Sequence, residues 1–250
     1  RHAFMVYPLV VQAIGARGIE VPARNYGHDL EAMSAAMGAD TKIVFLANPN
    51  NPTGTFLEWE DVRRFVERAP STALVVLDEA YGEYLSPERQ SPSPGWIARF
   101  PNLVVTRTLS KAYGLAGLRV GYGLAHPDVA ELMNRVRQPF NVNHLAMVAA
   151  CAALGDEAFI ERSRRVNAAG LEQLSKGFVR LGLEAIPSSG NFIAVRVGDA
   201  ARIYGCLLRE GVIVRPIAGY GMPEHLRVTV GTAPQNERFL AGLERALGQT

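Results

Sequence analysis

The sequence predicts an α/β protein with a mostly parallel sheet in a large domain, followed by a smaller C-terminal α+β domain. Short apolar segments rich in β-branched residues alternate with helical segments through the first 150 residues, which is typical of a parallel sheet with helices on both faces. From about residue 142 the pattern is helical for roughly forty residues, and short strands follow. We therefore expect a large domain over 1–154 and a small domain over 155–250.

In the large domain, four apolar segments have the length and the residue types of strands. They cover 19–21, 42–47, 73–77 and 103–106. Helices are expected over 29–37, where Asp29 can act as the N-cap, and over 58–68. A loop rich in proline and serine, 86–94, precedes the last of these strands.

In the second part of the chain, the apolar run 145–154 is about half a membrane span and rich in alanine, so it predicts a core helix. The strands expected after the helical region cover 192–197, 212–214 and 226–230. An amphipathic helix is expected over 236–247. These elements suit a small α+β domain.

Composition narrows the class of protein. The chain has 250 residues, 48% of them hydrophobic and 20% charged, as in a globular protein. A net charge of +2 is too balanced for a nucleic-acid-binding surface, and the longest apolar run predicts no membrane span. Cys151 and Cys206 form no C-x-x-C pair and are too few for a disulfide scaffold, and no signal peptide is visible, so we expect a cytoplasmic protein. The chain starts without methionine, and we expect it to be part of a longer protein.

Three predicted strands end in polar residues, where parallel sheets gather their ligands. The first is followed by an Asn- and Pro-rich segment, 47–54, which also suits an ordinary tight turn. The next ends in Asp78 and Glu79, as does the metal-holding strand of phosphate-loop ATPases. An ATPase needs a Gly-Lys pair in its phosphate loop, and this chain has none, so that alternative is disfavoured.

The last of these strands leads to Lys111, one of only three lysines among the 26 basic residues. A sheltered lysine loses solvation as a cation, so its pKa falls and its amine becomes nucleophilic. Three neighbours supply hydroxyls and a guanidinium that suit a phosphate: Thr108, Ser110 and Arg119. The glycines of this segment permit a close backbone approach but do not follow the G-x-G-x-x-G order, which argues against a dinucleotide-binding dehydrogenase.

An amine, a phosphate cradle, a carboxylate, a phenol and an amide at separate strand ends together suit pyridoxal 5'-phosphate. The sequence resembles the fold-type-I pyridoxal-phosphate-dependent transferases, among them the class-II aminotransferases and in particular the histidinol-phosphate aminotransferase family. The segments that carry the resemblance are 48–54, 77–81, 108–121, 211–216 and 224–231. They occur in the family's order and span nearly the whole chain.

The resemblance implies a role for each matching residue. Lys111 corresponds to the catalytic lysine that forms a Schiff base with the cofactor, and Asp78 to the partner of the pyridine nitrogen. Asn51 and Tyr81 correspond to the contacts of the ring hydroxyl, and Phe4 to the aromatic residue that stacks on the ring. The phosphate contacts correspond to Thr108, Ser110 and Arg119. No metal is expected.

The resemblance also implies a substrate and an assembly. Arg215 and Arg227 match the arginines that receive the substrate's anionic group. The implied reaction is transamination of histidinol phosphate with 2-oxoglutarate in histidine biosynthesis, by a homodimer that uses a small-molecule amino donor and a 2-oxo acid. A related aromatic-amino-acid aminotransferase, a phosphothreonine decarboxylase and a non-catalytic aminotransferase-like protein stay open as alternatives. The family's glycine-rich phosphate-holding segment, its N-terminal arm and a tyrosine from the neighbouring subunit have no counterpart in this chain.

Overall fold

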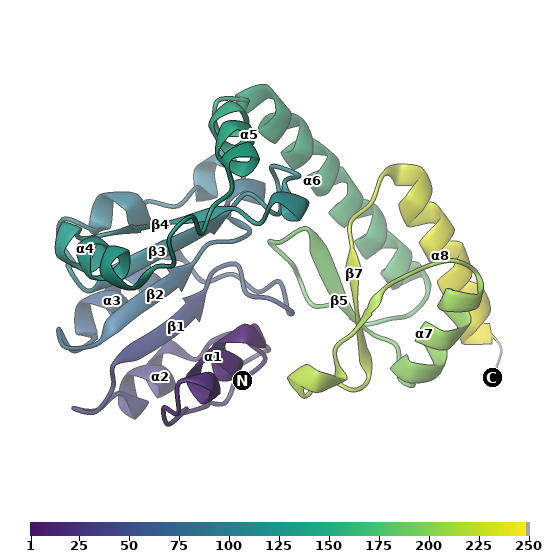
Figure 1. Cartoon of the computed structure of the whole chain (residues 1–250). Coiled ribbons are helices and arrows are strands. Elements are labelled where there is room, and N and C mark those ends of the chain that lie inside the picture. Colours follow the sequence, from purple (N-terminus) through teal and green to yellow (C-terminus); the bar gives the residue numbers. More distant parts are fainter. Residues whose placement is uncertain (249–250) are drawn as a thin grey trace.

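Two sheets organise the chain in the computed structural model, which describes residues 1–248. Each sheet lies in its own lobe, and Figure 1 shows the two lobes side by side with helix α6 running from one to the other. We call the part that surrounds strands β1 to β4 the large lobe and the part that surrounds β5 to β7 the small lobe. The N-terminus lies beside the gap between the lobes, and the C-terminal helix lies on the outer side of the small lobe (Figure 1).

The large-lobe sheet has the strand order β1-β2-β3-β4. Its parallel strands are β1 (Ile43–Ala47), β2 (Leu74–Asp78) and β3 (Leu103–Thr108), and β4 (Gly121–Ala125) is antiparallel at the edge. The register sets Ala47 beside Asp78 and Asp78 beside Thr106, so the three carboxyl ends lie in one row. The strands expected at 42–47, 73–77 and 103–106 are therefore confirmed.

Two predicted helices precede and follow β1. Helix α2 (Leu30–Ala36) begins after Asp29, whose Oδ1 accepts a hydrogen bond from the Ala32 N–H at 3.1 Å, as expected of an N-cap. Helix α3 (Trp59–Arg68) has a strongly amphipathic sequence and buries Val62, Phe65 and Val66 against alternate residues of the three parallel strands. This contact forms the core of the large lobe.

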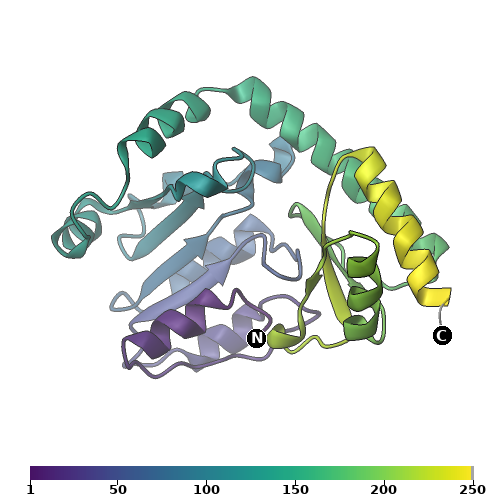
Figure 2. The same cartoon turned by 45° about the vertical axis from the view of Figure 1, so that its right-hand side comes forward.

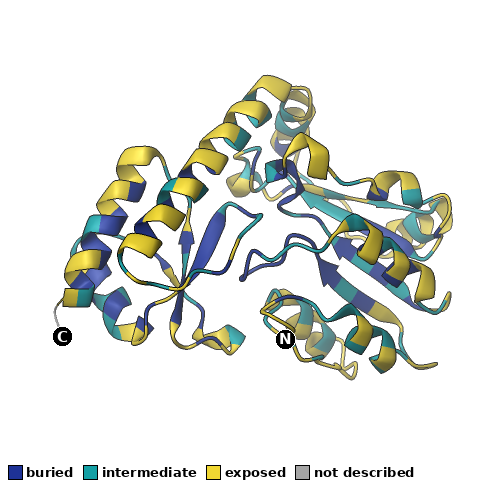
Figure 3. Ribbon diagram, turned by 180° about the vertical axis from the view of Figure 1, so that it is seen from behind, coloured by how far each residue is buried: buried dark blue, intermediate teal, exposed yellow. Residues whose placement is uncertain are grey.

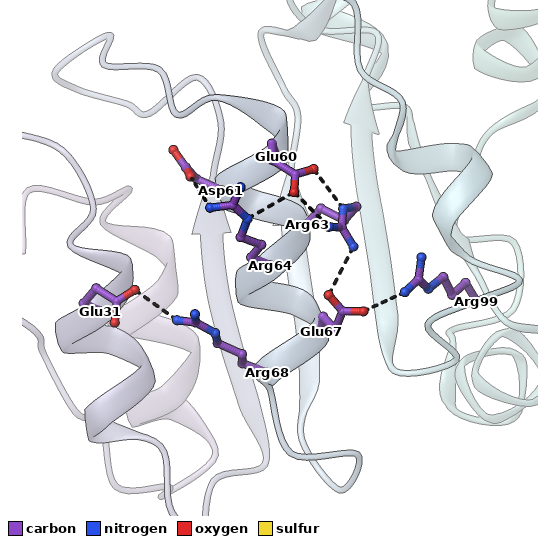
Figure 4. A network of polar contacts seen from close by, with 8 residues as sticks. All are labelled: Glu31, Glu60, Asp61, Arg63, Arg64, Glu67, Arg68 and Arg99. Atoms are coloured by element: carbon purple, nitrogen blue, oxygen red, sulfur yellow. Dashed lines mark hydrogen bonds and ion pairs between the residues drawn. The ribbon is translucent and has the colours of Figure 1, made fainter.

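The opposite side of α3 carries a network of exposed ion pairs (Figure 4). Within the helix, the Glu60 carboxylate forms ion pairs with Arg63 and Arg64. The Glu67 carboxylate forms ion pairs with Arg63 and with Arg99, which lies outside the helix. Arg68 reaches Glu31 of α2 in the same way. Exposed pairs of this kind contribute little stability individually. They neutralise the charge of several of the chain's arginines on the outer surface of α3.

Three helices connect the lobes along the outside of the molecule (Figure 2). They are α4 (Pro127–Val136), α5 (His144–Leu154) and α6 (Glu157–Arg180). Asp156 caps α6 by accepting from the Phe159 N–H at 3.0 Å, so the predicted forty-residue helical region is two helices broken at Gly155 and Asp156.

Helix α5 corrects one expectation. The run 145–154 is helical, but it is not a core helix: only Ala146 is buried, and most other positions are exposed (Figure 3). Leu145 is 73% exposed and Val148 56% exposed. The sequence of α5 is apolar all round, so its periodicity indicates no preferred face and does not distinguish a core helix from an exposed one.

The small-lobe sheet has the order β5-β7-β6 and is antiparallel. Its strands are β5 (Phe192–Arg196), β6 (Arg215–Pro216) and β7 (His225–Thr229). Helices α7 (Ala200–Arg209) and α8 (Ala233–Gly248) pack with the second half of α6 around a core that includes Leu174, Phe178 and Leu226. Strands 192–197 and 226–230 and the last helix are thus confirmed.

Two predicted strands are wrong. Residues 19–21 form no strand, and none of the described strands lies beside them to complete a hydrogen-bonded ladder. Residues 212–214 are also irregular, because the Val212 N–H closes the end of α7 on the Leu207 carbonyl at 2.9 Å; pairing starts only at Arg215. Sequence reasoning also missed α1 (Val6–Ala13), β4, α4 and α7.

Short 3-10 turns fill the connections. They are η1 (Gly82–Tyr84), η2 (Pro87–Arg89), η3 (Ser93–Trp96), η4 (Ala116–Leu118) and η5 (Ala218–Tyr220). η2 and the start of η3 lie in the predicted proline- and serine-rich loop. η1 follows Tyr81 and contacts α6, so it holds the end of β2 against the helix that connects the lobes.

Candidate active site

The pleat of β2 sends its two terminal carboxylates to opposite faces of the sheet. Val75, Leu77 and Glu79 are buried on the face that packs against α3, whereas Asp78 is half-buried on the other face. Glu79 binds Arg107 of β3, with 2.7 Å between Oε2 and Nη2. Its other oxygen accepts from the hydroxyls of Ser91 and Ser93. Glu79 is therefore fully engaged inside the protein.

Asp78 is held by two donors. Its Oδ1 accepts from the Ala80 N–H at 3.1 Å, and its Oδ2 accepts from the Tyr7 hydroxyl at 2.6 Å. Tyr7 is stacked on Phe45 of β1, with 4.8 Å between ring centroids, and meets Phe4 edge-on at 5.7 Å. Burial, together with the negative charge of Asp78, raises the pKa of Tyr7, so its phenol keeps the proton that it donates.

Sequence reasoning did not identify Tyr7. Phe4, which it did identify, lies just before α1, and Tyr7 follows it by three residues in the first turn of that helix. The spacing of three residues sets two aromatic side chains on one side of a helical turn. That spacing was the available signal, and it went unused because α1 itself was not predicted.

Lys111 lies in the loop after β3 and remains accessible to solvent. Partial burial of its amine lowers its pKa, and the positive charges of Arg227 and Arg119 lower it further, while Asp78 acts in the opposite direction. Its Nζ lies 5.6 Å from the centroid of the Tyr81 ring. The structure thus sets Lys111 near Tyr81 and within electrostatic reach of Asp78 and of both arginines.

Tyr81 links the two lobes. It is buried at the end of β2, and its ring meets Phe192 of β5 edge-on, with 5.1 Å between centroids. Burial raises the pKa of Tyr81 to about 12, although the positive charge of Arg227 opposes the increase. The phenol is therefore neutral near pH 7 and available as a hydrogen-bond donor.

Arg227 crosses from the small lobe to the large one. Its Nη1 donates to Oδ1 of Asn51, in the loop after β1, and its guanidinium lies over the Phe192 ring at 5.0 Å from the centroid. Its Nε is buried and has no hydrogen-bond partner among the described residues. Arg227 thus has N–H donors that are not used within the protein and can bind a ligand.

Arg215 is the direct cross-strand partner of Arg227 in the β6–β7 ladder. Directly opposed like charges destabilise a sheet unless something neutralises them. Within residues 1–248, neither arginine forms an ion pair with a carboxylate. Arg215 is exposed and Arg227 half-buried, so two uncompensated guanidinium groups are paired across the strands, and that of Arg227 acts on Lys111.

The expected phosphate contacts lie around the same loop. Thr108 ends β3, and its Oγ1 accepts from the Ser110 N–H at 3.1 Å. Arg119 follows η4 in a left-handed conformation, with φ of 56°, and donates to the Ala116 carbonyl at 2.7 Å. Opposite Thr108 stands Gly121, where an added Cβ would lie 2.7 Å from the Arg107 carbonyl oxygen. The glycine therefore lets β4 approach β3 next to this group.

A separate crevice of about 650 Å³ also opens between the lobes. It is lined by Tyr26, Phe56, Ile186 and His225, among others, and it contains none of the predicted site residues. Among the described residues, no cluster of three metal-ligating side chains occurs and no helix has the length and apolarity to cross a membrane.

A mostly parallel sheet with an activated lysine, a carboxylate and a phenol at its strand ends, facing an arginine pair on a small lobe, defines a fold-type-I transferase. The sequence matches the family model for aminotransferase class I and II over residues 3–243. The chain therefore belongs to that family.

Individual relatives agree with this assignment. The chain is 58% identical to histidinol-phosphate aminotransferase 2 of Ralstonia nicotianae, covering 100% of this chain and 68% of the relative. It is 59% identical to histidinol-phosphate aminotransferase 1 of Thiobacillus denitrificans, covering 99% of this chain and 64% of the relative. It is also similar to the crystal structure of histidinol-phosphate aminotransferase from Sinorhizobium meliloti in complex with pyridoxal-5'-phosphate, with a TM-score of 0.92, 31% identity, and coverage of 99% of this chain and 69% of that one. The chain thus spans about two thirds of the length of these relatives.

Proposed function

We propose that this protein is a pyridoxal-5'-phosphate-dependent aminotransferase that interconverts histidinol phosphate and 2-oxoglutarate with the corresponding keto compound and glutamate, in histidine biosynthesis. The observation that carries the proposal is the uncompensated pair of arginines, Arg215 and Arg227, beside an accessible lysine whose pKa is lowered. The names of the relatives support the choice of substrate.

The residues present fit the cofactor. When bound, pyridoxal phosphate supplies an aldehyde that links to amines and a ring that accepts electrons. Lys111 would hold the aldehyde carbon, and Asp78 would keep the pyridine nitrogen protonated. Asn51 and Tyr81 would donate to the ring hydroxyl, and Phe4 would cover the ring. The phosphate would be held by Thr108, Ser110 and Arg119.

Lys111 also supplies the base. A lysine with a lowered pKa is neutral in a larger fraction of molecules near pH 7, and only the neutral amine accepts a proton. In its neutral form, Lys111 would accept the proton from Cα of the substrate and would be the group that moves it within the site. Tyr81 stays protonated in this pH range, so it does not compete as a base.

The arginine pair would select the substrates. A guanidinium binds a carboxylate or a phosphate through two parallel hydrogen bonds, so the same pair can receive two anionic substrates in turn. Asn51 holds one edge of Arg227, which leaves the remaining donors of that guanidinium for the substrate. The interaction places the substrate's anionic group on the small lobe and its amine toward Lys111.

The decisive experiment is spectroscopic. The protein mixed with pyridoxal phosphate should give a visible chromophore that borohydride removes, and Lys111→Ala should lose it and lose turnover while binding the cofactor more weakly. A substrate panel of histidinol phosphate, phenylalanine and phosphothreonine should then favour the first. Absence of the chromophore would support a non-catalytic protein, and preference for either other substrate would refute the proposed donor.

We also propose that the protein is cytoplasmic and forms a homodimer, with a domain boundary between 154 and 155. The surface of α4 and α5 supports the dimer. The two helices expose Leu132, Val136, Leu145 and Val148, and the loop that joins them exposes Phe140. Large apolar side chains exposed along one segment favour a protein–protein interface. A second copy of the chain is the partner that the family resemblance implies.

A further inference from the structure

Helix α1 contributes no residue to a hydrophobic core. None of its residues is buried, and Val6, Leu9 and Val10 are exposed. Its half-buried side chains are Tyr7 and Val11, and Tyr7 lies over β1 on the same face of the sheet as Asp78. Through the hydrogen bond from Tyr7 to Asp78, α1 contacts the candidate site.

That contact is rigid at both ends. The Tyr7 ring is held parallel to Phe45, with an interplanar angle of 7°, and edge-on to Phe4, so its hydroxyl cannot easily swing away. On the other side, Asp78 Oδ1 is held by the Ala80 N–H. The terminal torsion of an aspartate is otherwise broad. The two donors together fix the plane of the carboxylate.

We propose that Tyr7 is a positioning residue for the cofactor, which holds the Asp78 carboxylate in the orientation that meets the pyridine nitrogen. This inference rests on the proposed function. Each carboxylate oxygen has two acceptor sites, so Asp78 can accept from Tyr7 and Ala80 and still receive the N–H of the ring. Tyr7 acts on the cofactor through Asp78.

The hydroxyl can be removed with little other change. Tyr7→Phe keeps the ring that stacks on Phe45 and deletes only the donor. Loss of a hydrogen bond to a charged group typically weakens binding, and we expect the dissociation constant for pyridoxal phosphate to rise about tenfold. At saturating cofactor, kcat should fall while KM for the amino donor stays within about twofold.

An analogue of the cofactor tests the route of the effect. In 1-deaza-pyridoxal phosphate a C–H group replaces the ring nitrogen, so Asp78 has no N–H to receive. Binding of this analogue should differ by less than about twofold between wild type and Tyr7→Phe, because both proteins lack the contact that Tyr7 orients. A purely structural role would weaken both ligands alike.

Tyr84→Phe is the matched control. Tyr84 is a half-buried phenol that hydrogen-bonds Asn191 at 3.4 Å instead of Asp78. The Tyr84→Phe variant should bind pyridoxal phosphate and its 1-deaza analogue as the wild type does. Thermal unfolding of all three proteins without cofactor shows whether each is folded.

The outcomes separate the two hypotheses. If the wild type binds pyridoxal phosphate and Tyr7→Phe binds it equally well, or loses both ligands equally, the positioning role is wrong while the proposed function stands. If the wild type itself does not bind pyridoxal phosphate, both are overturned. Selective loss of pyridoxal phosphate by Tyr7→Phe alone supports the inference.

Discussion

Adjacent residues of β2 have different chemical roles because the strand alternates its side chains. Asp78 faces the site, and Glu79 is buried on the other face against Arg107 and two serines. The pair Asp-Glu at a strand end suggests a metal-holding strand when read as letters alone. The alternation of side chains along the strand argues against a metal held by both residues, because only one of the two carboxylates can reach a ligand at this edge.

The first prediction concerns the guanidinium group of Arg227 and its planar arrangement of N–H donors. Arg227→Lys keeps one positive charge but loses the planar set of donors that can bind an anion and Asn51 together. We expect kcat/KM for the amino donor to fall about 30-fold, mainly through KM. Arg196→Lys, at an exposed pair with Glu224, is the control and should be unaffected. Steady-state kinetics measure kcat/KM for each variant. An equal loss of kcat/KM in both variants would refute the role of Arg227 in binding the substrate.

At the same scale, most of the site could be predicted from the sequence. Arg227 lies within β7 of the antiparallel small-lobe sheet and reaches the site through the packing of the two lobes. Asp78 ends a parallel strand, Asn51, Tyr81 and Lys111 follow parallel strands, and the carboxyl ends of parallel strands meet. Their association is therefore a consequence of topology. Tyr7 was missed because α1, which carries it, was not predicted, and the three-residue spacing from Phe4 does not by itself specify where a helix packs on the sheet.

Among the elements, the loop after β1 is held against the small lobe by a close approach. Gly54 has φ of +79°, and an added Cβ would collide with the Ser188 side chain. Its carbonyl oxygen accepts from the Ser189 N–H at 2.8 Å. A residue with a side chain would be strained at this position and would push the lobes apart.

The second prediction follows from this contact. Gly54→Ala should lower the free energy of unfolding by about 2–3 kcal/mol, from backbone strain and from the collision. Adding Ser188→Gly should recover the collision part only. Gly38→Ala is the control, because nothing lies within 4 Å of its Cβ position. Denaturant unfolding measures all four proteins, and an unchanged midpoint for Gly54→Ala would contradict the close approach.

A third prediction concerns the end of β1, where Nε2 of His28 accepts from the Ala47 N–H at 3.3 Å. Burial lowers the pKa of His28 to about 4 from an ordinary value of 6.5. The unfolded chain therefore takes up the proton first as the pH falls, so stability is present above pH 6.5 and is lost progressively toward pH 4. By pH 4 we expect a loss of roughly 3 kcal/mol from this group.

His28→Gln removes the titration and keeps an acceptor for the Ala47 N–H. The difference in unfolding free energy between this variant and the wild type should change between pH 7 and pH 4.5, in favour of the variant at the lower pH. Guanidinium unfolding at several pH values measures it. A constant difference across that range would show that His28 does not titrate with the fold.

The elements differ in how well local patterns predict them. Helix α2 has a capping residue and β1 to β3 have long apolar runs, and all four were predicted. β4 was hidden by Gly121 and Gly123, which weaken a strand pattern. The segments 19–21 and 212–214 are strand-like in composition, but a strand also needs a neighbour, and that requirement is not local. The boundary at 154/155 stays a prediction.

On the scale of the whole molecule, the apolar surface of α4 and α5 leads to a fourth prediction. Replacing Val136 and Leu145 with glutamate should weaken a dimer by at least about tenfold, since both side chains are largely exposed in one chain and charged groups are costly to bury. Ile213→Glu, at an equally exposed position on the small lobe, should not. Sedimentation velocity distinguishes dimer from monomer. A monomeric wild type, or a double variant that stays dimeric, would refute the interface.

The two lobes have separate hydrophobic cores, one built from residues 44–105 and the other from residues 174–246. No buried side chain belongs to both cores, although Tyr81 of the large lobe meets Phe192 of the small lobe between them, so we expect each lobe to form its own cooperative unit. The groups that would grip a ligand, Lys111 on one lobe and Arg227 on the other, belong to different units. A ligand that bridges them binds only when both are folded and docked, and mass action then favours that state. We therefore expect bound ligand to favour one melting transition over two, and resistance to proteases to rise with the supply of ligand.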